Sequence, residues 1–564
     1  MDFKQELVKL LSKELKWKEE DFNNLILVPP DPKLGDFAFP CFKVGGNPKE
    51  AAEKLKVKLK LPKFIERVEV AGPYLNFFLN KAVWAEETLT KIKKEKKKYG
   101  QGTENQNMVV EFCSPNTNKP LHLGHVRNMS LGDAMAKILD FQGNKVHPVE
   151  IVNDRGVHIC KSMLAYERWG NKKQPDKKTD HFVGDYYVIF AQKAKDLPGL
   201  EEEAQQMLVQ WEQGNQKVLT LWKKMNTWVL NGFKETYQRF GIKFEKEYFE
   251  SQFYLHGKEI AQEGLQKGIF EKDETGAVMV DLEQYGLGKK AVLRADGTSI
   301  YFTQDLYLAE LRQQDFKFDK LMYVVASEQN LHFRQLIKVL ELLGRTYAKN
   351  LYHLSYGMVN LPTGKMKSRE GTVVDADDIM DELSTLAAGE VRKRHENLSE
   401  KEIKQRGEFI ALGALKFYML KTDAVRDMIF NPEESLSFEG ETGPYVQYTH
   451  ARSCSLLRKA KEENQKKSGK INFTLLNTKE ELAVIKLLYE FPETLIKAAE
   501  QYKPHILCNH LIFLSQAFNE FYHAHQVISE DKDLMQTRLL LVDAVRQVLE
   551  NGLRLLGIHA PEEM

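Results

Sequence analysis

The chain has 564 residues, which is too many for one hydrophobic core, so we expect three or four domains. Apolar residues make up 42% and charged residues 29%, as is typical of a globular protein, and no apolar run approaches the roughly 20 residues of a membrane span. With 81 Lys and Arg against 80 Asp and Glu, the net charge of +1 neither requires nor excludes a polyanionic partner. The first 21 residues lack the pattern of a secretory signal, so we expect a cytoplasmic protein.

The five cysteines are scattered along the chain, and no two of them form a CxxC pair. This pattern argues against a disulfide framework and against a cysteine-rich zinc site. We therefore expect no structural metal.

Residues 1–100 predict a small α+β domain. A charged amphipathic helix starts it, a second helix is expected near 48–59, and a strand pair near 64–79 is broken by the turn signal Ala71-Gly72-Pro73. The lysine-rich stretch 85–102 closes the domain. Its lysines are interpreted either as the solvated face of a linker helix or as a contact to RNA phosphates.

A strand–loop–helix–strand unit follows. NMVVEFC at 107–113 reads as a buried strand, 126–142 shows the apolar spacing of a helix, and 144–154 reads as a second strand. Apolar residues of the expected helix form one stripe: Val126, Met129, Leu131, Met135 and Ile138. One βαβ unit predicts a parallel sheet.

The remainder divides into two parts. Residues 157–290 predict a long, largely helical insertion, after which strand and helix signals resume up to residue 384. From 385 to 564 nearly everything is helical, which predicts a separate bundle. The expected fold is therefore a multidomain α/β protein, with a Rossmann-like parallel-sheet domain at 101–384, a small α+β domain before it and an all-α bundle after it.

The loop 114–125 lies between the first strand and its helix, where parallel sheets bind ligands. It ends in His122-Leu123-Gly124-His125, and residues three apart on a first helical turn share one face. Gly124 would leave room for a nucleotide to approach the backbone. The two imidazoles either donate hydrogen bonds to ATP phosphates or serve as capping or surface histidines, and HxGH alone does not decide this.

A second element, Gly364-Lys365-Met366-Lys367-Ser368-Arg369-Glu370-Gly371, is basic and bounded by glycines. Such a loop can neutralise charge on a leaving pyrophosphate. Taken alone, such a segment is more often an ordinary exposed basic turn.

In this order the two elements resemble the HIGH and KMSKS signatures of class I aminoacyl-tRNA synthetases. The surrounding residues are similar to arginyl-tRNA synthetase blocks over nearly the whole chain: GDFAFP, VEFCSPNTNKPLHLGHVRN, VND, DGTSIYFTQDL, VASEQNLHF, SFEGETGPYVQYTHAR and LGIHAPEEM. Several long motifs in the family's order make the resemblance specific. It implies an N-terminal domain that contacts the tRNA elbow, a Rossmann-like catalytic domain and a helical domain that contacts the anticodon.

The resemblance also implies roles for individual residues. Catalytic roles fall on Lys119, His122, His125, Lys365 and Lys367. The family's ATP-binding positions fall on Pro115, Asn116, His122, Gly124, His125, Lys365, Met366 and Ser368. Its arginine-binding positions fall on Glu111, Ser114, Asn116, Tyr301, Asp305 and Gln329.

Among these, Tyr301 and Asp305 match the family's guanidinium pocket, whereas Glu111, Ser114 and Asn116 match positions that contact the amino acid's backbone groups or order the site. Asp305 has a second interpretation, as an acid at the start of a helix capped by Thr303. Glu111 is the more telling of the acids, because an unpaired carboxylate in a buried strand is costly.

One position departs from the family. Ser368 stands where KMSKS has its second lysine, and Lys367 comes one position early. Relatives that lack this lysine often carry one just upstream of the HIGH motif, where this chain has Lys119. We expect Lys119 to take over the charge role at the α-phosphate, with Lys367 or Arg369 as the rivals.

The resemblance thus implies an enzyme, an arginine–tRNA ligase whose substrates are ATP with Mg²⁺, L-arginine and tRNA(Arg). We expect a monomer that forms no contact with membranes. The alternatives are another ATP-dependent enzyme, such as a different class I synthetase or a nucleotidylyltransferase, and a non-catalytic RNA-binding relative. The stretch TGPYVQYTHAR either packs under the active site or contacts tRNA, and packing in a domain interface is favoured because Tyr445, Val446 and Tyr448 are aromatic or apolar.

Overall fold

The structure is a computed structural model that describes residues 2–22, 25–298, 300–360, 362, 374–395, 397–463 and 469–564. Among these residues, no helix has both the length and the apolar character needed to cross a membrane.

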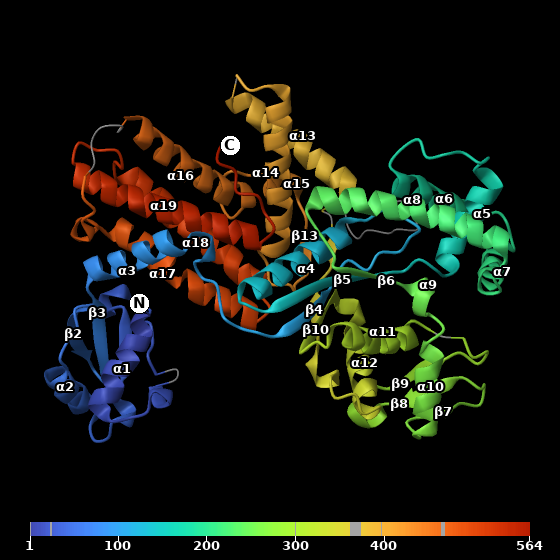
Figure 1. The fold of residues 1–564 in the computed structure, drawn as a ribbon, viewed down its shortest axis with the longest axis horizontal. Coiled ribbons are helices and arrows are strands. Elements are labelled where there is room, and N and C mark those ends of the chain that lie inside the picture. Colours follow the sequence, from blue (N-terminus) through green and yellow to red (C-terminus); the bar gives the residue numbers. More distant parts are fainter. Residues whose placement is uncertain are drawn as a thin grey trace.

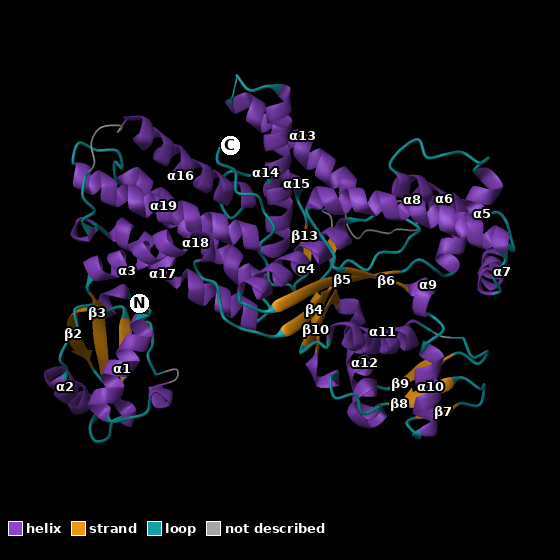
Figure 2. Ribbon diagram, in the orientation of Figure 1, coloured by secondary structure: helices purple, strands orange, loops and turns teal. Residues whose placement is uncertain are grey.

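A five-stranded parallel sheet lies at the centre of the molecule, with the strand order β11-β10-β4-β5-β6 (Figure 2). Its strands are β4 (Asn107–Glu111), β5 (Lys145–Val152), β6 (Lys246–Phe249), β10 (Lys320–Ala326) and β11 (Leu351–Tyr356). The chain runs outward from β4 through β5 to β6 and then returns to the other side of β4 with β10. The order therefore reverses between β4 and β10, where such sheets bind ligands at the carboxyl ends of their strands.

Helix α4 (Leu123–Phe141) joins β4 to β5 and completes the expected βαβ unit. The sequence predicts that one apolar stripe of α4 is buried, whereas the helix is buried on nearly every side. Its buried residues include Arg127, Asn128 and Asp133. Periodicity alone does not predict this burial, since it arises from the bundle helices that cover the outer face of α4 (Figure 1).

The region expected to be a largely helical insertion begins with α5 (Val157–Trp169), α6 (Thr179–Lys193), α7 (Leu200–Glu212) and α8 (Gln216–Phe240). It then returns to the main sheet as β6. A small antiparallel sheet follows, with the helices α9 (Glu250–Phe253) and α10 (Gly257–Gln266) and the strands β7 (Phe270–Lys272), β8 (Val278–Asp281) and β9 (Lys289–Leu293). Helices α11 (Tyr301–Phe316) and α12 (Asn330–Leu342) flank β10 in sequence.

The N-terminal part is a three-stranded antiparallel sheet covered by helices. Its elements are α1 (Phe3–Leu15), β1 (Phe37–Pro40), α2 (Pro48–Lys58), β2 (Ile65–Ala71), β3 (Tyr74–Leu79) and α3 (Lys81–Glu95). The expected turn at Gly72 joins β2 to β3. The lysine-rich stretch lies against the C-terminal helix, where Lys97 pairs with Glu550 at 3.1 Å and the Lys96 carbonyl accepts from Asn551, contacts that favour the linker interpretation.

The C-terminal part is an all-α bundle, as expected. Its elements are α13 (Ala376–Arg394), α14 (Glu400–Leu420), α15 (Pro432–Ser435), α16 (Gly443–Glu463), α17 (Lys479–Glu500), α18 (Pro504–Ala524) and α19 (Lys532–Leu555). A short parallel pair, β12 (Val359–Asn360) with β13 (Met428–Ile429), links it to the part of the chain that contains the central sheet. In the stretch TGPYVQYTHAR, Val446 is fully buried, as packing in an interface would require, but Tyr445 and Tyr448 are only partly buried.

Candidate active site

The loop after β4 turns sharply and is held to the end of β5. Cys113 and Ser114 both adopt positive φ angles, of 78° and 51°, in the left-handed region that non-glycine residues rarely occupy. The Asn153 amide donates to the Pro115 carbonyl at 2.9 Å, and the Thr117 amide donates to the Asn153 carbonyl at 3.1 Å. These bonds fix Pro115 and Asn116 at the carboxyl edge of the sheet.

The two signature histidines cap the N-terminus of α4. His122 is the N-cap residue, and its Nδ1 accepts from the Gly124 amide at 3.1 Å. His125 reaches back, and its Nδ1 accepts from the His122 amide at 3.1 Å. The two rings lie 4.0 Å apart between centroids. The capping interpretation of the sequence is therefore correct, and it is compatible with the other one because, within the described part of the chain, neither ring has a hydrogen-bond partner at Nε2.

This capping defines the chemistry of both rings. A ring nitrogen that accepts a backbone N–H carries no proton, so each neutral imidazole holds its proton on Nε2 and presents a donor there. Burial, together with the charge of Lys119, lowers the pKa of His122 to about 3. Burial also lowers the pKa of His125 well below its usual range, with His122 and Lys119 adding to the effect.

Gly124 is required by the His122 ring. A Cβ at this position would lie 2.9 Å from Cε1 of His122. The space next to Gly124 is thus filled by the capping imidazole, whereas the sequence interpretation left it for a nucleotide.

The start of α13 lies against this imidazole turn, which we define as residues 121–125. The Leu123 amide donates to the Val374 carbonyl at 3.1 Å, and the Ala376 amide donates to the Leu121 carbonyl at 2.8 Å. Asp375 forms a backbone β-bridge with His122. Burial lowers the pKa of Lys119, and the negative charge of Asp375 opposes that shift. The described chain resumes at residue 374, after the basic element at 364–371 that we call the lysine signature.

The chain before the lysine signature is also tied to α4. Arg127 is fully buried and donates to the carbonyls of Gly357 at 2.7 Å and of Ala424 at 2.9 Å. The described residues on both sides of the signature therefore contact the helix that carries the imidazoles. The signature residues themselves, Lys365, Met366, Lys367 and Ser368, lie outside the described residues.

The expected arginine-binding residues of α11 and α12 lie across the switch point. Asp305 pairs with His332 at 2.7 Å, and its charge acts on Glu111 at the end of β4. Gln329 ends the short 3-10 helix Ser327–Gln329 that follows β10, and its neighbour Asn330 begins α12. No motif or spacing in the sequence singles out His332.

The alternative interpretation of Asp305 as a first-turn acid behind a Thr303 cap is wrong. Ile300 is at the N-cap of α11, and the Thr303 hydroxyl donates to the Val292 carbonyl of β9. Asp305 is thus one turn into the helix, on the same face as Tyr301.

Glu111 forms an ion pair with Arg312 of α11, and both side chains are buried. The rings of Tyr248 and Tyr323 flank this guanidinium, with centroids at 5.2 and 5.6 Å from its carbon. Burial raises the pKa of Glu111, and Arg312 opposes the rise. The buried carboxylate that the sequence flagged is therefore neutralised within the protein.

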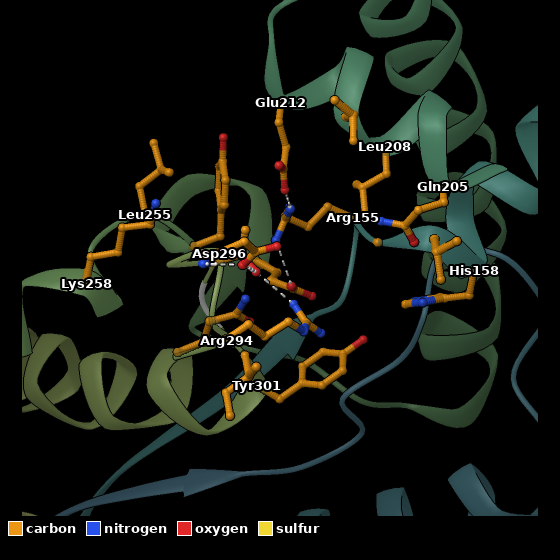
Figure 3. A pocket seen from close by; sticks show the side chains of 18 residues that line it. Arg155, His158, Gln205, Leu208, Glu212, Leu255, Lys258, Arg294, Asp296 and Tyr301 are labelled. Atoms are coloured by element: carbon orange, nitrogen blue, oxygen red, sulfur yellow. Dashed lines mark hydrogen bonds and ion pairs between the residues drawn. The ribbon is translucent and has the colours of Figure 1, made fainter. Parts of the chain in front are cut away.

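A hollow of about 420 Å³ opens beside α11, and Tyr301, which is exposed, lines it. Figure 3 shows Arg155 paired with Glu212 in the upper part of the hollow and Tyr301 at its lower edge. Glu250 also lines the hollow although it is almost fully buried, and one of its carboxylate oxygens lacks a hydrogen-bond partner. Burial raises the pKa of Glu250 to about 7, against the effect of Arg155. Apart from its position directly after the short strand β6, no sequence pattern marks Glu250 as a site residue.

Three family models match successive parts of the chain. The arginyl tRNA synthetase N terminal domain matches residues 2–79, the catalytic domain of class I (R) tRNA synthetases matches residues 88–432, and the DALR anticodon binding domain matches residues 446–564. The chain belongs to the arginyl-tRNA synthetase family. It is therefore a class I aminoacyl-tRNA synthetase, an ATP-dependent ligase.

Curated relatives of the arginyl-tRNA synthetase family agree over nearly the full length. An arginine–tRNA ligase of Treponema denticola is 47% identical over 96% of this chain and 94% of its own, and one of Treponema pallidum is 44% identical over 95% and 94%. Among solved structures, the arginyl-tRNA synthetase of Thermus thermophilus has a TM-score of 0.81 at 26% identity and covers 99% of this chain and 100% of its own.

We expect His122 and His125 to remain neutral, with the proton on Nε2, at about pH 5, where a free imidazole is mostly charged. Two-bond ¹H–¹⁵N correlation spectra of histidine-labelled protein measure this, with the urea-unfolded chain as the charged reference. Because the unfolded rings bind protons below about pH 6.5 and the folded rings do not, each histidine lowers the free energy of unfolding as the pH falls below 6.5. A protonated Nδ1 on either ring at pH 5 contradicts the assignment.

Proposed function

We propose that the chain forms arginyl-adenylate from L-arginine and ATP at the carboxyl edge of β4 and β10, and then transfers the arginyl group to the 3′-terminal ribose of tRNA(Arg). One observation carries this proposal. The capped imidazoles after β4 present Nε2–H donors beside Lys119, on the same edge of the sheet as Asp305 and Gln329. Phosphate donors and an acid suited to a guanidinium thus meet at one switch point.

In the first step the arginine carboxylate attacks the α-phosphate of Mg²⁺-ATP, and pyrophosphate leaves. His122 and His125 donate from Nε2 to phosphate oxygens, and Lys119 supplies the positive charge that the KMSKS departure removes. Pro115 and Asn116 place the backbone near the nucleotide, Gly124 leaves room for the His122 ring that faces it, and Lys365, Met366, Lys367 and Ser368 complete the site from the other loop. Each donor acts by stabilising developing charge, so no protein nucleophile is required.

Arginine selectivity is proposed to arise from Asp305 and Tyr301. Ser114 and Asn116 are assigned to the backbone groups of the amino acid, and Gln329 to another contact with the substrate. Asp305 pairs with His332, whose charge depends on protonation, so an incoming guanidinium can replace that contact. Glu111, which is held by Arg312, is assigned to ordering the site. A planar cation that pairs with a carboxylate discriminates strongly against analogues that leave the acid unpaired.

The helical bundle is proposed to contact the anticodon. A hollow of about 550 Å³ is lined by aromatic and basic side chains, among them Tyr445, Tyr448, Arg394 and Arg452. The Arg452 guanidinium lies 4.8 Å from the centroid of the Tyr448 ring. Unpaired RNA bases stack on aromatic rings and on arginine planes, so this surface suits single-stranded loop bases.

The proposal includes domain boundaries at 1–100, 101–384 and 385–564, with residues 1–100 contacting the tRNA elbow. It also includes that the protein acts as a monomer in the cytoplasm.

The variant Asp305→Ala should abolish arginine-dependent pyrophosphate exchange while the protein stays folded, because the substrate guanidinium loses its carboxylate. The exchange assay is run with each amino acid, with and without tRNA(Arg), and folding is followed by circular dichroism. Glu341→Gln, which changes an exposed acid of α12, is the control and should exchange as wild type does. Near-normal arginine-dependent exchange by Asp305→Ala would refute the assignment of Asp305 to the guanidinium pocket. If the wild-type protein supported exchange only with an amino acid other than arginine, the proposed function would be refuted.

The variant Lys119→Met should lower kcat for exchange about 100-fold or more, as expected when one preorganised charge at the reacting phosphate is lost. Lys367→Met should lower it by less than about tenfold, since a lysine one position early is not aligned with the family's site. The reverse order would assign the charge role to Lys367.

The variant Tyr448→Ala should weaken binding of tRNA(Arg) by about 10- to 100-fold, which corresponds to the loss of one base–aromatic stack. Filter binding measures this, and the KM for arginine at saturating tRNA should not change. Phe513→Ala removes an exposed aromatic ring elsewhere on the bundle and serves as the control. Equal loss of affinity in both variants would argue against a specific hollow.

A further inference from the structure

A polar cluster joins the helical insertion to the start of α13. It consists of Lys178, Asp180, His181, Thr236, Asp375 and Asp377. We call it the α6–α13 clasp. Three of its members, Asp180, Thr236 and Asp377, are buried.

Lys178 lies at the centre of the clasp. It is the residue before α6, and its ammonium donates to Asp180 at 2.9 Å, to the Thr236 hydroxyl of α8 at 2.7 Å and to Asp377 of α13 at 2.8 Å. Asp180, His181 and Asp377 also resemble a set of metal ligands. However, the ammonium of Lys178 already bridges the two carboxylates, and its charge repels a metal cation. The cluster is therefore a joint between the helical insertion and α13 within one chain.

His181 adds a second connection across the same joint. Its Nε2 lies 3.1 Å from Oδ2 of Asp377, and its Nδ1 lies 3.5 Å from Oδ2 of Asp375. Asp375 is the residue whose backbone bridges to His122 and whose charge faces Lys119. The clasp therefore contacts the imidazole turn directly, through the backbone of its member Asp375.

The packing of α6 makes the joint rigid. A Cβ at Gly184 of α6 would lie 2.7 Å from Cδ of Pro120, which follows Lys119 in the loop before the imidazole turn. A Cβ at Gly232 of α8 would lie 2.2 Å from the Asp180 carboxylate. Both helices thus approach too closely to shift without breaking the clasp.

We propose that Lys178 and His181 are positioning residues for the nucleotide: through Asp377 and Asp375 they hold residues 374–376 against the imidazole turn and so fix the aim of His122 and the surroundings of Lys119. This inference rests on the proposed function only in naming ATP as the ligand. Neither residue belongs to the matched signature motifs, and both come from the insertion.

The test compares kinetic constants in pyrophosphate exchange. His181→Ala and Lys178→Met should each raise the KM for ATP about tenfold and lower kcat, while the KM for arginine stays within about twofold. His181→Gln should recover most of the ATP affinity, because its amide can still donate to Asp377. Lys177→Ala is the matched control, since the neighbouring lysine pairs with Asp185 on the exposed side of α6 and should behave as wild type.

Calorimetric titration with ATP alone gives a readout that does not depend on the amino acid or on turnover. Lys178→Met leaves two buried carboxylates without their ammonium, so if it does not fold, the His181→Ala and His181→Gln pair carries the test. A merely structural role would reduce the active fraction and kcat without changing the Kd or KM for ATP, and that result in folded His181→Ala would overturn the inference. Wild-type protein that binds ATP but lacks arginine-dependent exchange would refute the proposed function and leave the ATP comparison valid.

Discussion

The capping of α4 by its own imidazoles is the interaction on which the rest of the site depends. The backbone amides of His122 and Gly124 donate to Nδ1 of His125 and His122, so two otherwise unsatisfied N–H groups are paired and both proton positions are set. Burial lowers the pKa of each ring and keeps it neutral, which makes Nε2–H a donor that survives over the physiological range. Gly124 is needed because any side chain would collide with the His122 ring.

Charge balance around the switch point distinguishes Asp305, the acid proposed to bind the substrate guanidinium, from the acids that pair with the protein's own arginines. Glu111 is neutralised by Arg312, and Glu250 lies 3.5 Å from Arg155, so each of these acids has a resident guanidinium partner. Asp305 instead contacts His332, which holds it without a permanent charge. An acid paired in this way can exchange its partner for a substrate cation, whereas breaking a buried arginine pair is costly.

Helix α13 links two distant parts of the molecule. The amide of its first residue, Ala376, donates to the imidazole turn, and its last residue, Arg394, lines the aromatic hollow of the bundle together with His395, which directly follows the helix. Its 19 residues span about 28 Å. Arg239 of α8 ties the middle of this helix to α14 through Asp381 and Glu408.

The sequence alone determined the βαβ unit, the strand pair with its turn at Gly72, the helical bundle and the family, because periodicity, turn residues and contiguous motifs are local properties. Tertiary structure decided the partners. The Arg312 that neutralises Glu111, the His332 beside Asp305 and the lysine and histidine of the α6–α13 clasp are far from their partners along the chain, so no spacing rule connects them. Likewise, only packing shows that α4 is buried all round and that the room beside Gly124 belongs to an imidazole, since burial and close approach depend on elements that meet in space.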